Sequence, residues 1–202
     1  MTSRRRLTPD QRREELLDVG SELFAALPFD QVSLDDVADR AGVSRALVYR
    51  HFAGKRELFT AIYQRAADRL LAATVFDPGL PLVDQIDAGL RAHFDYFESN
   101  RNTVLAANRV LAGDPHVEAI IGDELTQLAD RLVAVTGLRG HSRTLLAATM
   151  TAWLAYVRVL SVEWLTHQAF SREELHDLCV GALRGAAGTI LDFEHTPRPT
   201  DT

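Results

Sequence analysis

Basic residues gather between residues 40 and 56, and no carboxylate interrupts them: Arg40, Arg45, Arg50, Lys55 and Arg56. Guanidinium and ammonium groups bind the phosphates and base edges of nucleic acids. The whole chain is acidic, with a formal net charge of −6, yet residues 1–59 carry ten Arg and Lys against ten Asp and Glu. This cluster, with three further arginines at residues 4–6, predicts a surface for a polyanion.

The residues that must position this cluster form a pattern of two short helices joined by a tight turn. Ser33 and Ser44 can each cap a helix through the side-chain oxygen, and Gly42 can adopt the left-handed backbone of the turn. Apolar residues within 34–41, and Val48 on the second helix, provide inner faces that can pack together. We therefore predict a helix-turn-helix, whose second helix can enter a major groove.

The outward face of that second helix follows from placing its residues at 100° intervals with Val48 inward. Arg45 and Arg50 can then donate to guanine, while Ala46 or Leu47 can contact a thymine methyl group. The remaining polar residues suit phosphates, including the two serines at the helix starts. The predicted DNA-binding residues are Ser33, Ser44, Arg45, Ala46, Leu47, Tyr49, Arg50, His51 and Lys55.

Almost every other segment repeats its apolar residues with a helical period, and we find no alternating run typical of a strand. The sequence predicts an all-α protein of about nine helices, at residues 9–26, 34–41, 44–51, 55–75, 80–99, 102–112, 115–137, 142–168 and 171–192. Ser142 and Ser171 are expected to cap the last two helices. The predicted domains are a DNA-binding domain with a basic N-terminal arm (1–54), a ligand-binding and dimerisation domain (55–194) and a disordered tail (195–202).

Residues 13–58 resemble the N-terminal domain of TetR-family transcriptional regulators. The resemblance rests on the segments ELLDVGSELFAALPF, VSLDDVADRAGVSRALVYRHF and GKRELF, and its most specific part is the run AGVS-x3-VYRHF-x2-K. It implies a three-helix DNA-binding domain, joined through a long fourth helix to a larger helical domain that binds a ligand and dimerises. It also implies that Ser33, Tyr49, His51 and Lys55 contact phosphates, and that Arg45 and Ala46 face bases.

The chain departs from the family pattern in two places. Leu27-Pro28-Phe29 stands where family members often have glycine after the first helix, so this turn is expected to differ. Leu47 replaces a common small hydroxyl residue, which removes a polar contact to the DNA.

The last two predicted helices carry more apolar surface than one packing partner needs. We therefore expect a homodimer in which both helices pair with their symmetry mates as a four-helix bundle. Glycines at 181, 185 and 188 would allow a close approach. The expected interface residues are Leu175, Leu178, Ala182, Leu183, Ala186 and Ile190.

Bulky side chains are abundant in the second domain, and we expect some of them to enclose a small, largely apolar ligand. The candidate ligand-binding residues are His93, Phe97, Met150, Trp153, Tyr156 and Val157. Any one of these side chains is equally consistent with ordinary core packing.

An enzyme is not expected, because the sequence has no HExxH, no Gly-rich phosphate loop and no GxSxG motif. The single cysteine, Cys179, excludes a disulfide framework and a thiolate metal cluster, and we expect no metal and no cofactor. No apolar run approaches the ~20 residues of a membrane span, so a cytoplasmic protein is expected.

Together these features predict a DNA-binding transcriptional regulator, a repressor that a small molecule releases from its double-stranded DNA operator. The alternative is a DNA-binding adaptor or architectural protein without a small-molecule effector.

Overall fold

The computed structural model describes residues 7–77 and 79–191, and the expected basic arm and C-terminal tail lie outside these residues. The protein is all-helical, as predicted, and the described residues contain no strand. The chain divides into two compact units, one of residues 1–66 with 100–117 and one of residues 67–99 with 118–202. This division differs from the expected boundary after residue 54, because residues 55–66 and 100–117 pack with the N-terminal helices.

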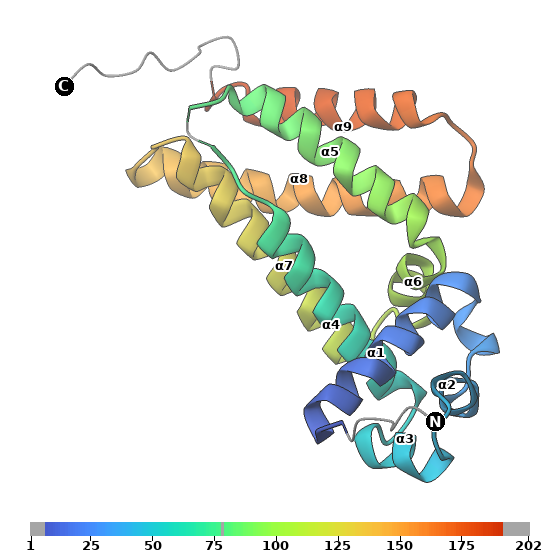
Figure 1. Ribbon diagram of the computed structural model, residues 1–202. Helices are drawn as coiled ribbons and strands as arrows, with labels where there is room; N and C mark the ends of the chain where they lie inside the picture. Colours follow the sequence, from blue (N-terminus) through green and yellow to red (C-terminus); the bar gives the residue numbers. More distant parts are fainter. Residues whose placement is uncertain (1–6, 78, 192–202) are drawn as a thin grey trace. The chain divides into compact units, whose positions relative to one another are not determined.

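The first unit is built from α1 (Pro9–Ala26), the 3-10 turn η1 (Phe29–Gln31), α2 (Leu34–Ala41), α3 (Arg45–His51) and the start of α4 (Lys55–Ala73). Two short segments far along the chain complete it, α6 (Arg101–Leu105) and the π-helical η2 (Ala106–Val110). Figure 1 shows α2 and α3 next to each other below α1. The Asn102 side chain ties α6 to α1 by donating to the carbonyl of Ala25 at 2.9 Å.

Aromatic rings form the centre of the first unit. The rings of Phe24, Phe29 and Phe59 lie 5.1 to 5.7 Å apart, in stacked and edge-on arrangements that such pairs favour. Gly20 allows α1 to approach α4 closely, because a Cβ there would lie 2.7 Å from Cδ1 of Ile62. The α-helices of this unit are thereby held on a rigid apolar core.

The second unit contains α5 (Leu82–Ser99), α7 (Pro115–Val135), α8 (Gly140–His167) and α9 (Arg172–Ala187), with the end of α4. Figure 1 shows α8 and α9 running alongside each other, with α5 crossing them. The buried residues that join these helices are Ile86, Leu90, Phe94, Ala129, Leu132, Val133, Leu146, Met150, Trp153, Val157, Leu175, Cys179, Leu183 and Ala187.

The helix starts of this unit agree only in part with the prediction. Ser171 caps α9 in a full capping box with Glu174. Ser142, however, lies inside α8, which begins after Arg139, so its predicted capping role is wrong. The first residue of α8 is Gly140, with a positive φ of 59°, two residues before the predicted cap.

By length and composition α8 could span a membrane, with a mean hydropathy of 1.6 over its most apolar 18 residues. One such helix is weak evidence for a membrane span, because the core helix of a globular protein meets the same criteria. Only 39% of that window is buried inside the structure. The rest of this window leaves apolar surface on α8.

Candidate nucleic-acid interface

The recognition helix, our name for α3, is anchored from below by two apolar side chains. Val48 of this helix and Phe52, the residue that follows the helix, are both completely buried. Arg45, Ala46, Tyr49 and Arg50 are exposed on the other side, whereas Leu47 and His51 are half-buried. The exposed face thus presents two guanidinium groups, one phenol and one methyl group, which are suited to a major groove.

The two guanidinium groups of the recognition helix differ in their surroundings. Nη1 of Arg45 lies 2.9 Å from Oδ2 of Asp35 on α2, so this arginine already has an anionic partner. Arg50 makes no ion pair with any described residue and stands fully available to a phosphate or a base. No local sequence pattern indicated the pairing of Asp35 with Arg45.

Ser33 and Ser44 occupy equivalent positions but have different roles. The Ser33 hydroxyl accepts from the Asp36 N–H at 3.2 Å, and the Ser33 backbone N–H donates to Oδ2 of Asp36 at 2.8 Å, which completes a capping box. The hydroxyl also donates to the same Oδ2 at 2.6 Å. These hydrogen bonds lower the pKa of Asp36. The Ser44 side chain makes no capping hydrogen bond at the start of α3. Only the Ser44 hydroxyl is therefore uncommitted.

Lys55 is occupied within the first unit. Its Nζ donates to the carbonyl of Phe29 at 2.8 Å and lies 3.4 Å from that of Asp30, and it sits 4.5 Å from the centre of the Phe29 ring. The lysine thus caps the η1 turn that replaces the expected glycine after α1. To bind a phosphate, Lys55 must give up its hydrogen bonds to these carbonyls.

His51 is only partly accessible. Its Nε2 atom is enclosed and has no hydrogen-bond partner among the described residues. A phosphate contact by this residue in the present conformation therefore cannot use Nε2. Nothing in the sequence pattern distinguishes the two ring nitrogens.

Polar side chains from three helices meet inside the second unit, and we name His93, Glu124, Arg158 and Ser161 the buried polar cluster. Nε2 of His93 lies 3.2 Å from Oγ of Ser161, which itself donates to the carbonyl of Val157. Burial, and secondarily the charge of Arg158, lowers the pKa of His93 to about 3. The imidazole is therefore neutral at physiological pH.

The charged half of the cluster joins α7 to α8. Nη1 of Arg158 lies 3.4 Å from Oε2 of Glu124, and the two side chains are only 8% and 14% exposed. The guanidinium also lies 5.7 Å from the ring centre of Phe97, and the Phe97 and His93 rings are tilted against each other with centres 3.9 Å apart. Of the four cluster residues, the sequence indicated only His93 as a candidate ligand-binding residue, together with the neighbouring Phe97. It did not indicate Glu124, Arg158 or Ser161. The signal for Arg158 was a lone charge within the apolar run VRVLSV.

The other predicted ligand-binding residues are dispersed. Met150, Trp153 and Val157 are buried in the core, and Trp153 donates to the Cys179 carbonyl at 2.8 Å, which joins α8 to α9. Tyr156 is 40% exposed on the outer side of α8. Its side chain therefore faces away from the interior where a ligand was expected.

The predicted interface residues of α9 divide by burial. Leu175 and Leu183 are buried in the core of their own unit, because they face α8 and α5. Leu178 is 48% exposed, Ala186 is also exposed, and Ala182 and Ile190 are half-buried. The helical period identified the apolar residues without separating these two faces.

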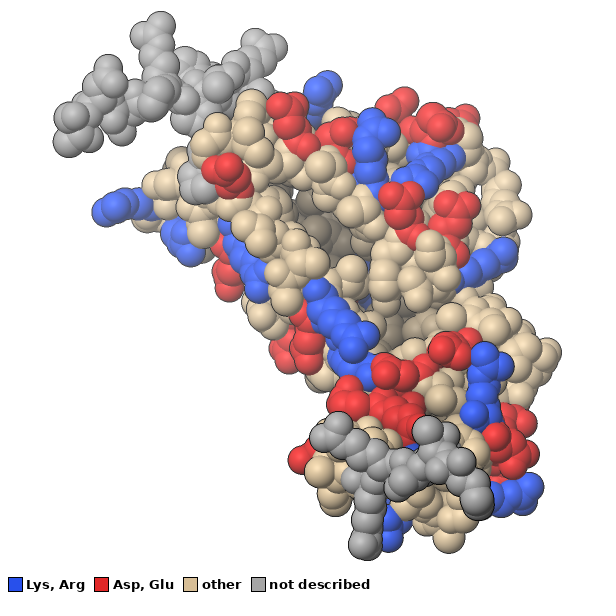
Figure 2. All heavy atoms as spheres, viewed as in Figure 1, with Lys and Arg blue, Asp and Glu red and all other residues tan. Residues whose placement is uncertain are grey.

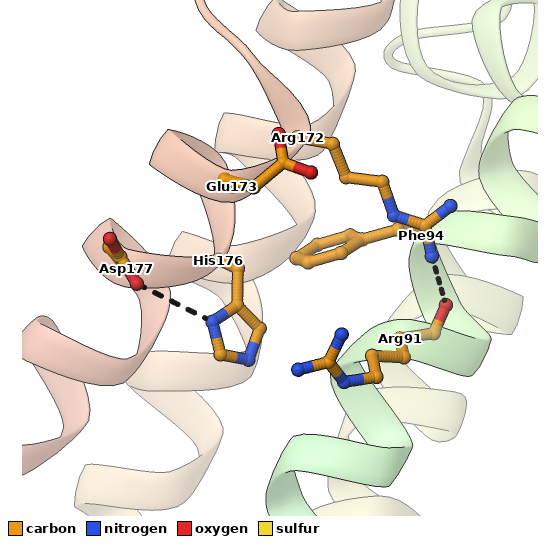
Figure 3. Close-up of a pocket in the computed structure, with 6 residues that line it drawn as sticks. All are labelled: Arg91, Phe94, Arg172, Glu173, His176 and Asp177. Atoms are coloured by element: carbon orange, nitrogen blue, oxygen red, sulfur yellow. Dashed lines mark hydrogen bonds and ion pairs between the residues drawn. The ribbon is translucent and has the colours of Figure 1, made fainter.

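Acidic and basic side chains gather over α5 and α9 (Figure 2). They border a surface cleft of about 400 Å³ lined by Arg91, Phe94, Arg172, Glu173, His176 and Asp177, with the Phe94 ring among the charged groups (Figure 3). Both arginines are ion-paired, Arg91 with Asp87 and Arg172 with Asp95 and Glu98, and Nε2 of His176 lies 2.7 Å from Oδ1 of Asp87. Within residues 7–77 and 79–191, no three His, Cys, Asp or Glu side chains are grouped to hold a metal ion.

Comparisons with known proteins agree with this geometry. A family model described as "Bacterial regulatory proteins, tetR family" matches residues 16–62, which hold most of α1, all of α2 and α3 and the start of α4. The chain is 29% identical over 154 residues to the HTH-type transcriptional activator FasR of Mycolicibacterium smegmatis, covering 73% of this chain and 70% of that protein. It is 28% identical over 98 residues to the probable acrEF/envCD operon repressor of Escherichia coli, covering 45% and 44% of the two chains.

The similarity extends to solved folds. The crystal structure of a tetR-family transcriptional regulator from Streptomyces coelicolor superposes with a TM-score of 0.80 at 24% identity, over 91% of this chain and 83% of that one. The family match covers the helix-turn-helix, and the structural likeness covers both units. With its exposed basic recognition helix, the chain belongs to the TetR family of DNA-binding transcriptional regulators.

Proposed function

We propose that the chain is a homodimeric repressor, acting in the cytoplasm, that leaves its operator when a small molecule binds in the second unit. The buried polar cluster carries this proposal. Burying an ion pair costs desolvation energy that a well-packed apolar core would avoid, so such a pair is weak as a purely structural feature. A ligand site, by contrast, needs a few polar groups placed among apolar ones.

Dimerisation is supported by apolar surface on α8 and α9. Leu145, Tyr156 and Val159 are 40 to 64% exposed, and their spacings of 11 and 3 residues place them on one side of α8. On α9, Leu178 is exposed, and Cβ atoms at Gly181 and Gly185 would meet open space. A second copy related by a two-fold axis would cover both stripes with equivalent residues.

The regulatory mechanism requires two states of the dimer that differ in operator affinity. A ligand releases DNA only if it binds more tightly to the state that does not fit the operator. Helix α4 passes from the first unit into the second without interruption, so it is one covalent route between the two sites. A bound dimer blocks transcription without a contact to polymerase, which favours repression.

Footprinting of the purified protein on the DNA flanking its own gene tests the proposal. We expect a near-palindromic site with half-sites about 34–36 Å apart, or a larger spacing if two dimers bind. Arg50→Ala should abolish protection, whereas Arg143→Ala, which removes an exposed charge from α8, should leave it intact. A single unpaired half-site would contradict the dimer, and a thorough effector screen that never releases DNA would favour the adaptor function.

A further inference from the structure

The buried polar cluster has the chemistry of an anion site in an apolar setting. Arg158 is the one member whose charge is permanent, and its side chain is almost fully buried. The rings of His93 and Phe97 lie beside it, and Trp164 lies 6.3 Å from the neighbouring Phe94 ring. A ligand at this position would meet one cation surrounded by aromatic surface.

The ion pair that holds Arg158 is not optimal. Its Nη1–Oε2 separation of 3.4 Å to Glu124 is longer than the 2.7–2.9 Å typical of charge-assisted hydrogen bonds. Burial raises the pKa of Glu124 despite the nearby guanidinium, so the carboxylate is poorly stabilised in this position. Both observations indicate that a better anionic partner can displace Glu124 from Arg158.

The surface of the second unit is hollowed beside α5, the helix that supplies His93 (Figure 2). We propose that the buried polar cluster binds the carboxylate of a small organic acid, with Arg158 as its cationic partner and the aromatic rings around its apolar body. This inference rests on the proposed function, since it names the chemical class of the effector.

The surface cleft between α5 and α9 is the rival anion site in this unit. Arg91 is exposed and Arg172 is half-buried, and both are already ion-paired, Arg91 with Asp87 at 2.8 Å and Arg172 with Asp95 at 2.7 Å. Exposed ion pairs are hydrated and screened, and therefore add little binding energy. Arg91→Gln thus provides a matched control, because it removes one cation from the cleft and none from the buried polar cluster.

The test compares acids with their uncharged amides, using calorimetry and the fluorescence of Trp153 and Trp164. The probes are decanoate against decanamide and 4-phenylbutanoate against 4-phenylbutanamide, within a series of aliphatic and aryl acids of varied length. A charge-assisted contact predicts that at least one acid binds about 10- to 100-fold more tightly than its amide. Equal binding of every pair, or binding of no acid, would overturn the inference.

Variants then locate the site. Arg158→Gln should remove the preference for the acid, but it leaves Glu124 buried without its partner and can unfold the protein. The double variant Arg158→Met/Glu124→Leu replaces the whole pair with apolar groups, a change that buried pairs usually tolerate. It should fold and bind acid and amide alike, whereas Arg91→Gln should retain the preference. Loss of the preference in Arg91→Gln alone would assign the anion to the surface cleft and overturn the inference.

Operator release separates this inference from the proposed function. An acid that binds at Arg158 without releasing DNA would support the inference and contradict effector-controlled repression. Neutral compounds that release DNA, with no acid that binds, would support repression and overturn the inference.

Discussion

Arg45, the first residue of the recognition helix, is paired with Asp35 of α2 through an Nη1–Oδ2 distance of 2.9 Å. The two side chains are 65% and 37% exposed, so the pair contributes at most about 1 kcal/mol. To contact a guanine, Arg45 must therefore leave the Asp35 carboxylate for the base edge, and this exchange costs little free energy. Asp35 also places a negative charge next to the surface that approaches DNA.

Asp35→Asn should raise affinity for operator and non-specific DNA, because it removes this competition and a repulsion from phosphates. We expect an increase of about 3- to 5-fold, corresponding to less than about 1 kcal/mol. Arg45→Ala should instead lose discrimination at one base pair, worth roughly 1–3 kcal/mol if the contact is bidentate. Titrations on the operator and its single-base variants measure both effects.

Asp39→Asn is the matched control, since Asp39 is an exposed carboxylate on the same helix without a contact to Arg45. If Asp39→Asn raised DNA affinity as much as Asp35→Asn does, the gain would come from the change in net charge and not from the release of Arg45. A loss of operator affinity in Asp35→Asn, with non-specific binding unchanged, would show instead that Asp35 orients Arg45 for the base.

The two serine caps should respond differently to removal of the hydroxyl. Ser33→Ala breaks the capping box of α2 and should cost about 1 kcal/mol of unfolding free energy. Ser44→Ala removes no capping bond and should change stability by less than about 0.5 kcal/mol, but it should weaken DNA binding if that hydroxyl contacts a phosphate. Denaturant titrations and DNA titrations of both variants distinguish these roles, and equal destabilisation would contradict the assignment.

Local rules explain what the sequence predicted correctly about the fold. The turn at Gly42 and the caps at Ser33 and Ser171 depend on neighbouring residues only, so their positions could be inferred before any tertiary structure was known. The 3-10 turn at Phe29–Gln31 could not, because Lys55 stabilises it from 26 residues away. The participation of α6 in the first unit likewise depends on a tertiary contact.

The candidate sites show the same contrast between features set by neighbouring residues and features set by tertiary contacts. The outer face of α3 was predictable because a short helix with one buried anchor leaves little choice of orientation. The stripe on α9 was ambiguous, since Leu178 and Leu183 are both apolar and only the packing of α8 decides which is buried. Glu124 lies 34 residues from Arg158, and no local pattern links them.

The dimer prediction now has a sharper test on α9. Leu178→Asp places a charge on the exposed stripe, so the monomer should stay folded while dimerisation and operator binding fail. Leu183→Asp places the same charge in the core and should unfold the second unit instead. Sedimentation and circular dichroism separate these outcomes, and a folded, fully dimeric Leu178→Asp variant would place the interface on another surface.

His93 should make the stability of the second unit sensitive to acid. Burial lowers its pKa from 6.5 to about 3 in the folded protein, so between these values the unfolded chain binds a proton that the folded protein does not. Its contribution is therefore complete above pH 6.5 and is lost as the pH falls toward 3, amounting to about 3 kcal/mol near pH 4. Glu124 has the opposite pH dependence. Because burial raises its pKa in the folded protein, its contribution to stability is complete below pH 4.5 and is lost as the pH rises above that value.

The difference between the stability-against-pH curves of the parent protein and of His93→Gln gives the contribution of His93, because the Glu124 contribution is common to both curves. His93→Gln retains a donor toward Ser161 but cannot be protonated, so it should lose less stability than the parent protein as the pH falls from 6.5. Ser161→Ala removes the hydroxyl while the imidazole stays buried, and it should keep the acid sensitivity because burial is the larger cause of the shift. Denaturant unfolding followed by Trp153 and Trp164 fluorescence measures each curve. Parallel curves for His93→Gln and the parent protein would mean that the imidazole is hydrated in the folded state.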